Sequence, residues 1–149
     1  MTLTALLASK ISGASVFYVL IKYNALMALS AAQLPFAVPP NVALGLIMIC
    51  GHAASFALVV PVMAARPEQP RIKASVGSSS LALLIGFAPA GLLGIPGLSG
   101  LAAAVAASIG FVAYLKLKSA AASSGALGLC QMASEACFYL GALAAWSYI

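Results

Sequence analysis

Charged residues are almost absent from this 149-residue chain, and they divide it into long apolar stretches. The chain carries seven Lys or Arg residues and two Glu residues, and it contains no aspartate. Hydrophobic residues make up 64% and charged residues 6%, whereas soluble domains are about 45–50% apolar and about 25% charged. With a mean hydropathy of +1.12, such a chain cannot cover a water-facing surface with polar groups. A lipid bilayer is therefore the solvent that it fits, and the chain is predicted to be an integral, multi-pass membrane protein.

Prolines, glycines and charges separate five apolar segments. A helix needs about 20 mostly apolar residues to cross roughly 30 Å of hydrocarbon, and proline ends helices because it lacks the backbone N–H. The sequence predicts an all-α, polytopic transmembrane helix bundle with one domain, residues 1–149. Its predicted spans are residues 11–34, 41–65, 74–95, 98–117 and 123–147. The fourth span is marginal because Pro96 to Gly100 is expected to form a tight turn. A four-span arrangement with a re-entrant 96–118 segment stays open.

The cations predict which side of the membrane each loop faces. With five spans, six cations share one side and the opposite side has none. These six are Lys10, Arg66, Arg71, Lys73, Lys116 and Lys118. Short cytoplasmic loops carry the excess of Lys and Arg in membrane proteins, so the N-terminus is expected inside and the C-terminus outside. The last five cations are also expected to contact lipid headgroups, whose phosphates attract juxtamembrane basic residues. No basic face is interleaved with aromatic residues, so nucleic acid is not an expected partner.

Three polar residues fall in the interiors of the predicted spans. Lys22, His52 and Glu135 each lie about 16–18 Å from a predicted span end, at 1.5 Å per residue. A charged group at that depth costs on the order of 2.5–3.5 kcal/mol and normally faces a partner or a wet cavity. We therefore expect Lys22 and Glu135 to meet inside the bundle, with His52 as a third member. They would form either an ion pair or a site with a neutral Glu135.

Each of these residues also has a plainer interpretation. Lys22 has four methylenes and can extend toward the headgroups, and His52 can bond a backbone carbonyl. His52 lies in Cys50-Gly51-His52-Ala53-Ala54, where small neighbours leave room for a flat macrocycle. An imidazole nitrogen suits haem or chlorophyll, so His52 is a candidate axial ligand. Glu135 can serve as a structural partner, a proton carrier or a contact to a neighbouring subunit.

Small residues recur four apart in the predicted spans, which indicates close helix packing. Small-xxx-small pairs let helix backbones approach each other where lipid removes the hydrophobic drive between helices. The pairs are Ala28/Ala32, Gly86/Ala90, Ala103/Ala107, Ala121/Gly125 and Gly141/Ala145. The packing that they predict is either internal or against other subunits.

The scarcity of polar chemistry argues against an enzyme. The chain has one histidine, one intramembrane acid and no aspartate, so a His/Cys metal cluster and a Ser/His/Asp triad are both missing. The leading hypothesis is a small accessory subunit of a larger bioenergetic membrane complex, respiratory or photosynthetic, in contact with lipids, pigment or haem, and other subunits. The alternative is a small self-associating transporter or proton/ion channel that uses Glu135 with Lys22 or His52.

Overall fold

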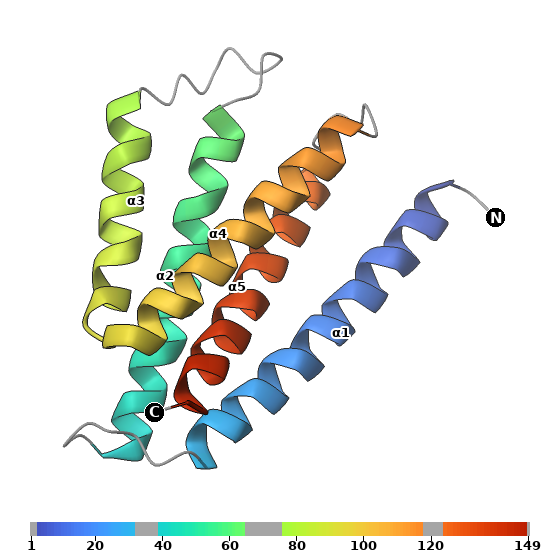
Figure 1. Cartoon of the computed structure of the whole chain (residues 1–149). Coiled ribbons are helices and arrows are strands. Elements are labelled where there is room, and N and C mark those ends of the chain that lie inside the picture. The colour runs from blue at the N-terminus through green and yellow to red at the C-terminus, as the bar shows by residue number, and fades with distance from the viewer. Residues whose placement is uncertain (1–2, 32–38, 65–75, 118–123, 149) are drawn as a thin grey trace.

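The computed structural model describes five helices, over residues 3–31, 39–64, 76–117 and 124–148 (Figure 1). Their bounds are Leu3–Ala31 for α1, Pro40–Ala64 for α2, Val76–Gly91 for α3, Gly94–Leu117 for α4 and Ser124–Trp146 for α5. All regular structure in these ranges is helical, so the predicted all-α fold is confirmed. Four of the helices contain segments long and apolar enough to cross a membrane. By length and composition, these helices are compatible with a multi-pass membrane protein.

The shortest apolar helix is α3, not the predicted fourth segment. The predicted turn at Pro96 to Gly100 is wrong, because these residues lie in the first turns of the 24-residue helix α4. The chain turns earlier, at Leu92 and Leu93. Gly94 then takes a φ of +65°, which glycine adopts without steric strain. Proline does not break a helix in its first turn, because the N–H groups there have no acceptor within the helix.

Successive helices run in opposite directions (Figure 1). The N-terminal ends of α1, α3 and α5 lie at the upper end of the bundle, and α2 and α4 finish there. Lys10 lies in the N-terminal third of α1, and Lys116 is the last residue but one of α4, so both lie in the helix parts nearer this end. Arg66, Arg71, Lys73 and Lys118 lie outside the described residues. Which end faces inward, and the contacts of these cations with lipid headgroups, stay predictions.

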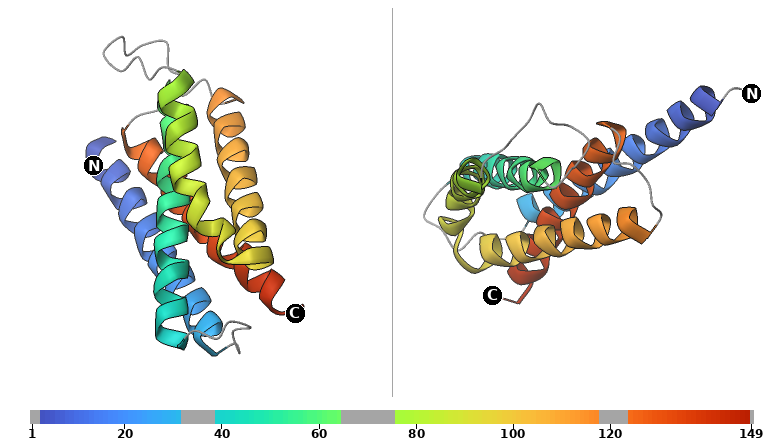
Figure 2. Two further views of the ribbon diagram at one scale, coloured as in Figure 1. Left: turned by 90° about the vertical axis from the view of Figure 1, so that its left-hand side faces the viewer. Right: turned by 90° about the horizontal axis from the view of Figure 1, so that it is seen from above.

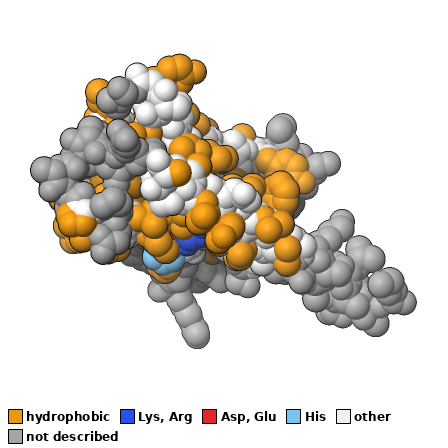
Figure 3. Space-filling view, turned by 90° about the horizontal axis from the view of Figure 1, so that it is seen from below, with side chains coloured by type: hydrophobic (Ala, Val, Ile, Leu, Met, Phe, Trp, Pro, Cys, Tyr) orange, Lys and Arg blue, Asp and Glu red, His pale blue; other side chains and the backbone are white. Residues whose placement is uncertain are grey.

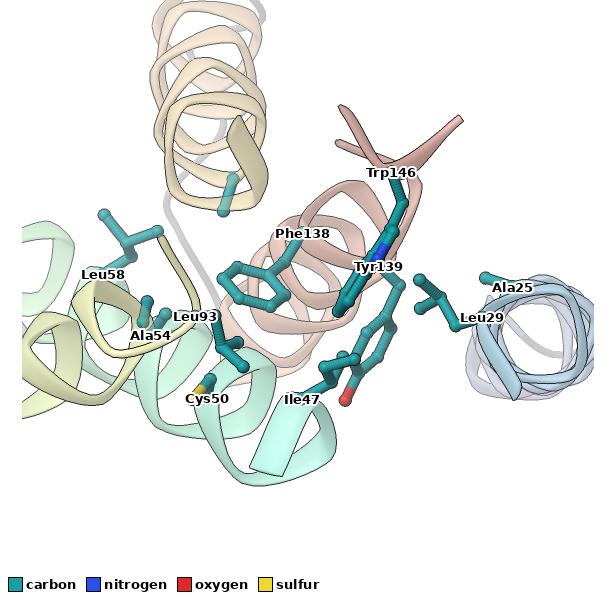
Figure 4. Packing of buried hydrophobic residues seen from close by; sticks show 12 residues of the cluster. Ala25, Leu29, Ile47, Cys50, Ala54, Leu58, Leu93, Phe138, Tyr139 and Trp146 are labelled. Atoms are coloured by element: carbon teal, nitrogen blue, oxygen red, sulfur yellow. The ribbon is translucent and has the colours of Figure 1, made fainter. Parts of the chain in front are cut away.

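Helix α5 lies at the centre of the bundle. It packs against α4, α2 and α1, whereas α3 packs against α2 and α4. The largest fully buried side chains are Phe138 and Tyr139 of α5, whose rings meet edge to face with centroids 5.9 Å apart. Figure 4 shows them between residues of α1, α2 and the α3–α4 turn, including Leu29, Ile47 and Leu93. The core is therefore built around one face of α5.

Small residues bring α4 and α5 into backbone contact. A Cβ on Gly141 would lie 2.7 Å from the Cβ of Ala103 and 2.8 Å from the carbonyl oxygen of Ser99. A Cβ on Gly100 would lie 2.8 Å from the carbonyl oxygen of Phe138. Only glycine permits these approaches, and the Ser99 hydroxyl donates a hydrogen bond of 2.9 Å to the Gly141 carbonyl across the interface. The close packing predicted for Gly141 and Ala103 is thus internal.

Helix α1 is attached far less closely. The share of buried residues in its apolar segment, Gly13–Ala31, is 11%, which is the lowest of the four long apolar segments. The corresponding shares are 17% for Gly94–Leu115 of α4, 39% for Gly125–Trp146 of α5 and 44% for Val42–Val62 of α2. Ala25 and Leu29, in its C-terminal half, reach the core. Toward the N-terminus the helix diverges from the bundle (Figures 1 and 2). The polar cluster described next lies where α1 still touches its neighbours.

Candidate functional site

The three polar residues predicted in the spans lie at the same depth. Lys22 is nine residues from either end of the segment Gly13–Ala31, and His52 is ten from either end of Val42–Val62. Glu135 is ten residues from the start of Gly125–Trp146 and eleven from its end. At 1.5 Å per residue, each lies about 15 Å from the ends of its helix segment. This depth corresponds to the middle of the hydrocarbon layer.

Glu135 of α5 is the centre of the cluster. Its side chain is 3% exposed, and both carboxylate oxygens have partners. Lys22 Nζ of α1 lies 2.6 Å from Oε1, and His52 Nδ1 of α2 lies 3.3 Å from Oε2. The structure thus brings the three residues together in an arrangement with an ion pair. A buried carboxylate without such partners would cost several kcal/mol.

Two tyrosines complete the cluster, and neither was predicted from the sequence. The Tyr139 hydroxyl donates to Glu135 Oε1 at 2.8 Å, and it lies 3.3 Å from the Met48 carbonyl oxygen. Lys22 Nζ donates to the Tyr18 hydroxyl at 3.2 Å. The same ammonium lies 5.5 Å from the Tyr18 ring centroid and 5.6 Å from the Tyr139 ring centroid, within the range of cation–π attraction. The sequence did contain one indication of these contacts, because each tyrosine is four residues from a charged residue and therefore lies on the same helix face.

The cluster is exposed to the outside of the bundle at Lys22 and His52. The side chain of His52 is 60% exposed and that of Lys22 is 25% exposed. Figure 3 shows the exposed lysine and histidine next to each other at the surface, bordered by hydrophobic side chains. These two residues belong to α1 and α2, which make limited contact with each other. The buried Glu135 is thus bonded to two side chains that are themselves exposed.

Gly51, the residue before His52, packs against α5 and does not leave room beside the imidazole. Gly51 was expected to leave room for a flat macrocycle beside His52. Gly51 instead lies on the face of α2 that meets α5, where an added Cβ would lie 2.7 Å from Tyr139 Cε1 and 3.0 Å from Phe138 Cδ1. It lets α2 approach the aromatic rings of α5. The expectation about Gly51 is thus wrong, although His52 itself faces outward.

The cluster combines a compensated charge with proton-bearing groups. Glu135 and Lys22 balance each other, and the carboxylate accepts from Tyr139 and from the His52 ring. A hydrogen-bonded series consequently runs from Tyr18 through Lys22 and Glu135 to the exposed ring of His52. Such an arrangement can hold α1 on the bundle, pass a proton or present the imidazole to a ligand.

No protein-family model, curated protein or solved structure matches this chain. The geometry of the cluster and the surfaces around it are therefore the basis for assigning a function.

Proposed function

We propose that this chain is a small accessory subunit of a larger membrane complex, and that α1 forms the contact with a neighbouring membrane-embedded chain. Respiratory and photosynthetic complexes are the class that we favour. The observation that carries this proposal is a polar side chain on the outer face of α1. The exposure of this helix and the short connections between the described helices also support it.

Asn24 is an exposed amide near the middle of the membrane. It is two residues from Lys22 along α1, and its Nδ2 donates to the Leu20 carbonyl oxygen at 2.8 Å. This bond uses one N–H group, and the side-chain oxygen has no partner among the described residues. Lipid chains cannot supply a hydrogen-bond donor, whereas a polar group on a neighbouring helix can. Asn24 therefore favours a protein neighbour at this face.

The rest of α1 around Asn24 is suited to helix packing. Asn24 lines a groove of about 380 Å³ between α1 and α5, with Phe17, Leu20, Leu140 and Leu143. Val16, Phe17, Val19 and Leu20 are all more than half exposed, so the part of the helix next to Asn24 presents apolar side chains to its surroundings. A second helix placed here would cover both the groove and the amide.

Site-specific photo-crosslinking in native membranes tests the assembly role. A photoreactive phenylalanine analogue replaces Phe17 in one variant and Leu84 of α3 in the control, so that Asn24 stays in place. Phe17 lines the same groove as Asn24 and is 66% exposed, and Leu84 is 68% exposed and lies near the middle of its helix. We expect a protein adduct of discrete mass from position 17 that co-migrates with a large complex after mild extraction, and none from position 84. Equal labelling at both positions, or no protein adduct at position 17, would contradict the proposal.

A second candidate function is proton or ion transport by an oligomer of this chain. The observation that favours it is the series of titratable side chains from Tyr18 to His52, which crosses from the buried carboxylate to the surface. The protein reconstituted in liposomes is expected to show flux that Glu135→Gln abolishes if this function is correct. Unchanged flux in Glu135→Gln, or no flux in the wild type, would exclude transport through the cluster.

A further inference from the structure

The carboxylate of Glu135 determines how the imidazole of His52 is oriented. An ionised carboxylate only accepts hydrogen bonds, so the ring nitrogen facing it, Nδ1, carries the proton. Lys22 already balances the charge of Glu135 through the 2.6 Å contact. His52 therefore serves as a neutral donor, and its lone pair is on the other ring nitrogen, Nε2.

Nε2 is the acceptor that the described residues leave without a partner. His52 Nδ1 contacts Glu135, and the ring stacks at a tilt on Phe56 with centroids 6.0 Å apart. The residue is 60% exposed at the middle of α2. Hydrocarbon offers no hydrogen-bond donor at this depth. An imidazole held in this way has the geometry of a metal ligand, since metal-binding histidines almost always donate their other ring N–H to a carboxylate, a carbonyl or water.

The surroundings of His52 limit what kind of metal can bind. In the part of the chain that the structure describes, no group of three or more His, Cys, Asp or Glu side chains could hold a metal ion. A metal at Nε2 consequently has to bring its other ligands with it. A planar macrocycle supplies four nitrogen ligands, needs one axial nitrogen from the protein and has apolar faces that suit the membrane.

We propose that His52 Nε2 is the axial ligand of a metal tetrapyrrole that lies against the outer face of α2, with Glu135 as the positioning residue behind it. Ile49 and Phe56, one turn away on either side of His52, are each about 60% exposed, and Met48 is also exposed. These apolar side chains provide the wall on which a macrocycle packs. The proposal goes beyond the assembly role and does not depend on it, because the site is formed by α1, α2 and α5 of a single chain.

Titration of the purified protein with two macrocycles tests the site. The protein is prepared in detergent with an affinity tag that contains no histidine, because His52 is the only histidine of the chain. The probes are haemin and zinc protoporphyrin, which represent the haem class and the closed-shell, chlorophyll-like class. We expect saturable binding of one macrocycle per chain with a shifted Soret band. The probe that binds more tightly indicates whether the site prefers the haem class or the chlorophyll-like class.

Variants separate axial ligation from partition into the micelle. His52→Ala is expected to lose the Soret shift, and added imidazole is expected to restore it. Leu84→Ala changes an exposed residue of α3, which is not part of the proposed site, and this variant should bind like the wild type. Glu135→Gln should weaken binding about 10-fold and lower the iron–histidine stretching frequency of the reduced haem complex, which a purely structural role would not change. Binding of neither probe, or equal binding by His52→Ala, would overturn the proposal and leave the crosslinking result at Phe17 unaffected.

Discussion

The α4–α5 interface and the attachment of α1 show two different ways to hold helices together in lipid. Between α4 and α5, glycine and alanine bring the backbones into contact. Helix α1 is largely exposed and is held by Ala25, Leu29 and the ion pair of Lys22 with Glu135. Because lipid chains are as apolar as leucine, packing and polar contacts must replace hydrophobic burial as the drive for association. The α4–α5 interface is held mainly by close packing, and the attachment of α1 depends more on polar contacts.

The largest effect is expected where a charge is left without its partner. Lys22→Met removes the ammonium and leaves Glu135 buried with only hydroxyl and imidazole donors. Breaking a buried pair in this way costs about 3–5 kcal/mol. The measurement is unfolding in mixed detergent and SDS, followed by the fluorescence of Trp146, the only tryptophan of the chain, which is buried on α5.

The double variant Lys22→Met with Glu135→Met is the control for this prediction. Replacing both partners with apolar residues of similar size removes the uncompensated charge, and such replacements are often neutral or stabilising. The double variant should therefore be more stable than Lys22→Met alone. A double variant at least as unstable as the single one would show that the contact between the two residues does not attach α1.

The steric interface should be sensitive to a single methyl group. Gly141→Ala places a Cβ against Ala103 and the Ser99 carbonyl oxygen, both closer than 3.0 Å. Backbone atoms cannot move aside cheaply, so overpacking is expected to cost about 1–3 kcal/mol. The same unfolding assay measures the change.

Gly128→Ala is the matched control on the same helix. An added Cβ at Gly128 meets nothing within 4 Å, and alanine has the higher helix propensity. Its stability should equal or slightly exceed that of the wild type. If Gly141→Ala and Gly128→Ala behave alike, close approach does not determine the strength of the α4–α5 interface.

A smaller effect is expected for the polar contact between α4 and α5. The hydroxyls of Ser108 and Ser134 lie 2.7 Å apart in the buried interface, and Ser134 also donates to the Cys130 carbonyl oxygen. Ser108→Ala removes one hydrogen bond, and interhelical bonds in membranes average about 0.6 kcal/mol, with a maximum near 1.7. Ser30→Ala, whose hydroxyl bonds within its own exposed helix, should change stability less. An equal loss of stability in Ser108→Ala and Ser30→Ala would contradict an interhelical role for the Ser108 hydroxyl.

The helical fold was predictable because lipid imposes a simple requirement on sequence. Every backbone polar group must be satisfied within the membrane, so long uncharged segments become helices. The α3–α4 turn was not predictable by the same rule. Pro96 and Gly97 are usual in loops, yet they are also compatible with the start of a helix. Which of the two structures they form depends on the chain turning earlier, where Gly94 takes a positive φ. Breaker residues therefore indicated a boundary but placed it several residues late.

The cluster was predictable in its charged members and not in its neutral ones. Lys22, His52 and Glu135 stood out because a charge or an imidazole is costly at the centre of a span. Tyr18 and Tyr139 resemble ordinary apolar or interfacial residues, so only the packing of α1 and α5 reveals their hydroxyl contacts. Gly51 was misinterpreted for the same reason, because a sequence does not say which face of α2 meets α5.

The smallest effect on stability is expected at the outer face of α1. Asn24→Leu removes a side-chain hydrogen bond to the Leu20 carbonyl oxygen within the same helix, while α1 keeps its inner contacts through Ala25 and Leu29. The isolated protein should thus unfold within about 0.5 kcal/mol of the wild type, as most surface substitutions do. Association in native membranes should weaken at the same time, because the amide no longer bonds a neighbouring chain. The assays are unfolding of the purified protein and co-migration with the complex after mild extraction. A large loss of stability would place Asn24 in the attachment of α1 to its own bundle, whereas unchanged association would remove the amide from the proposed contact.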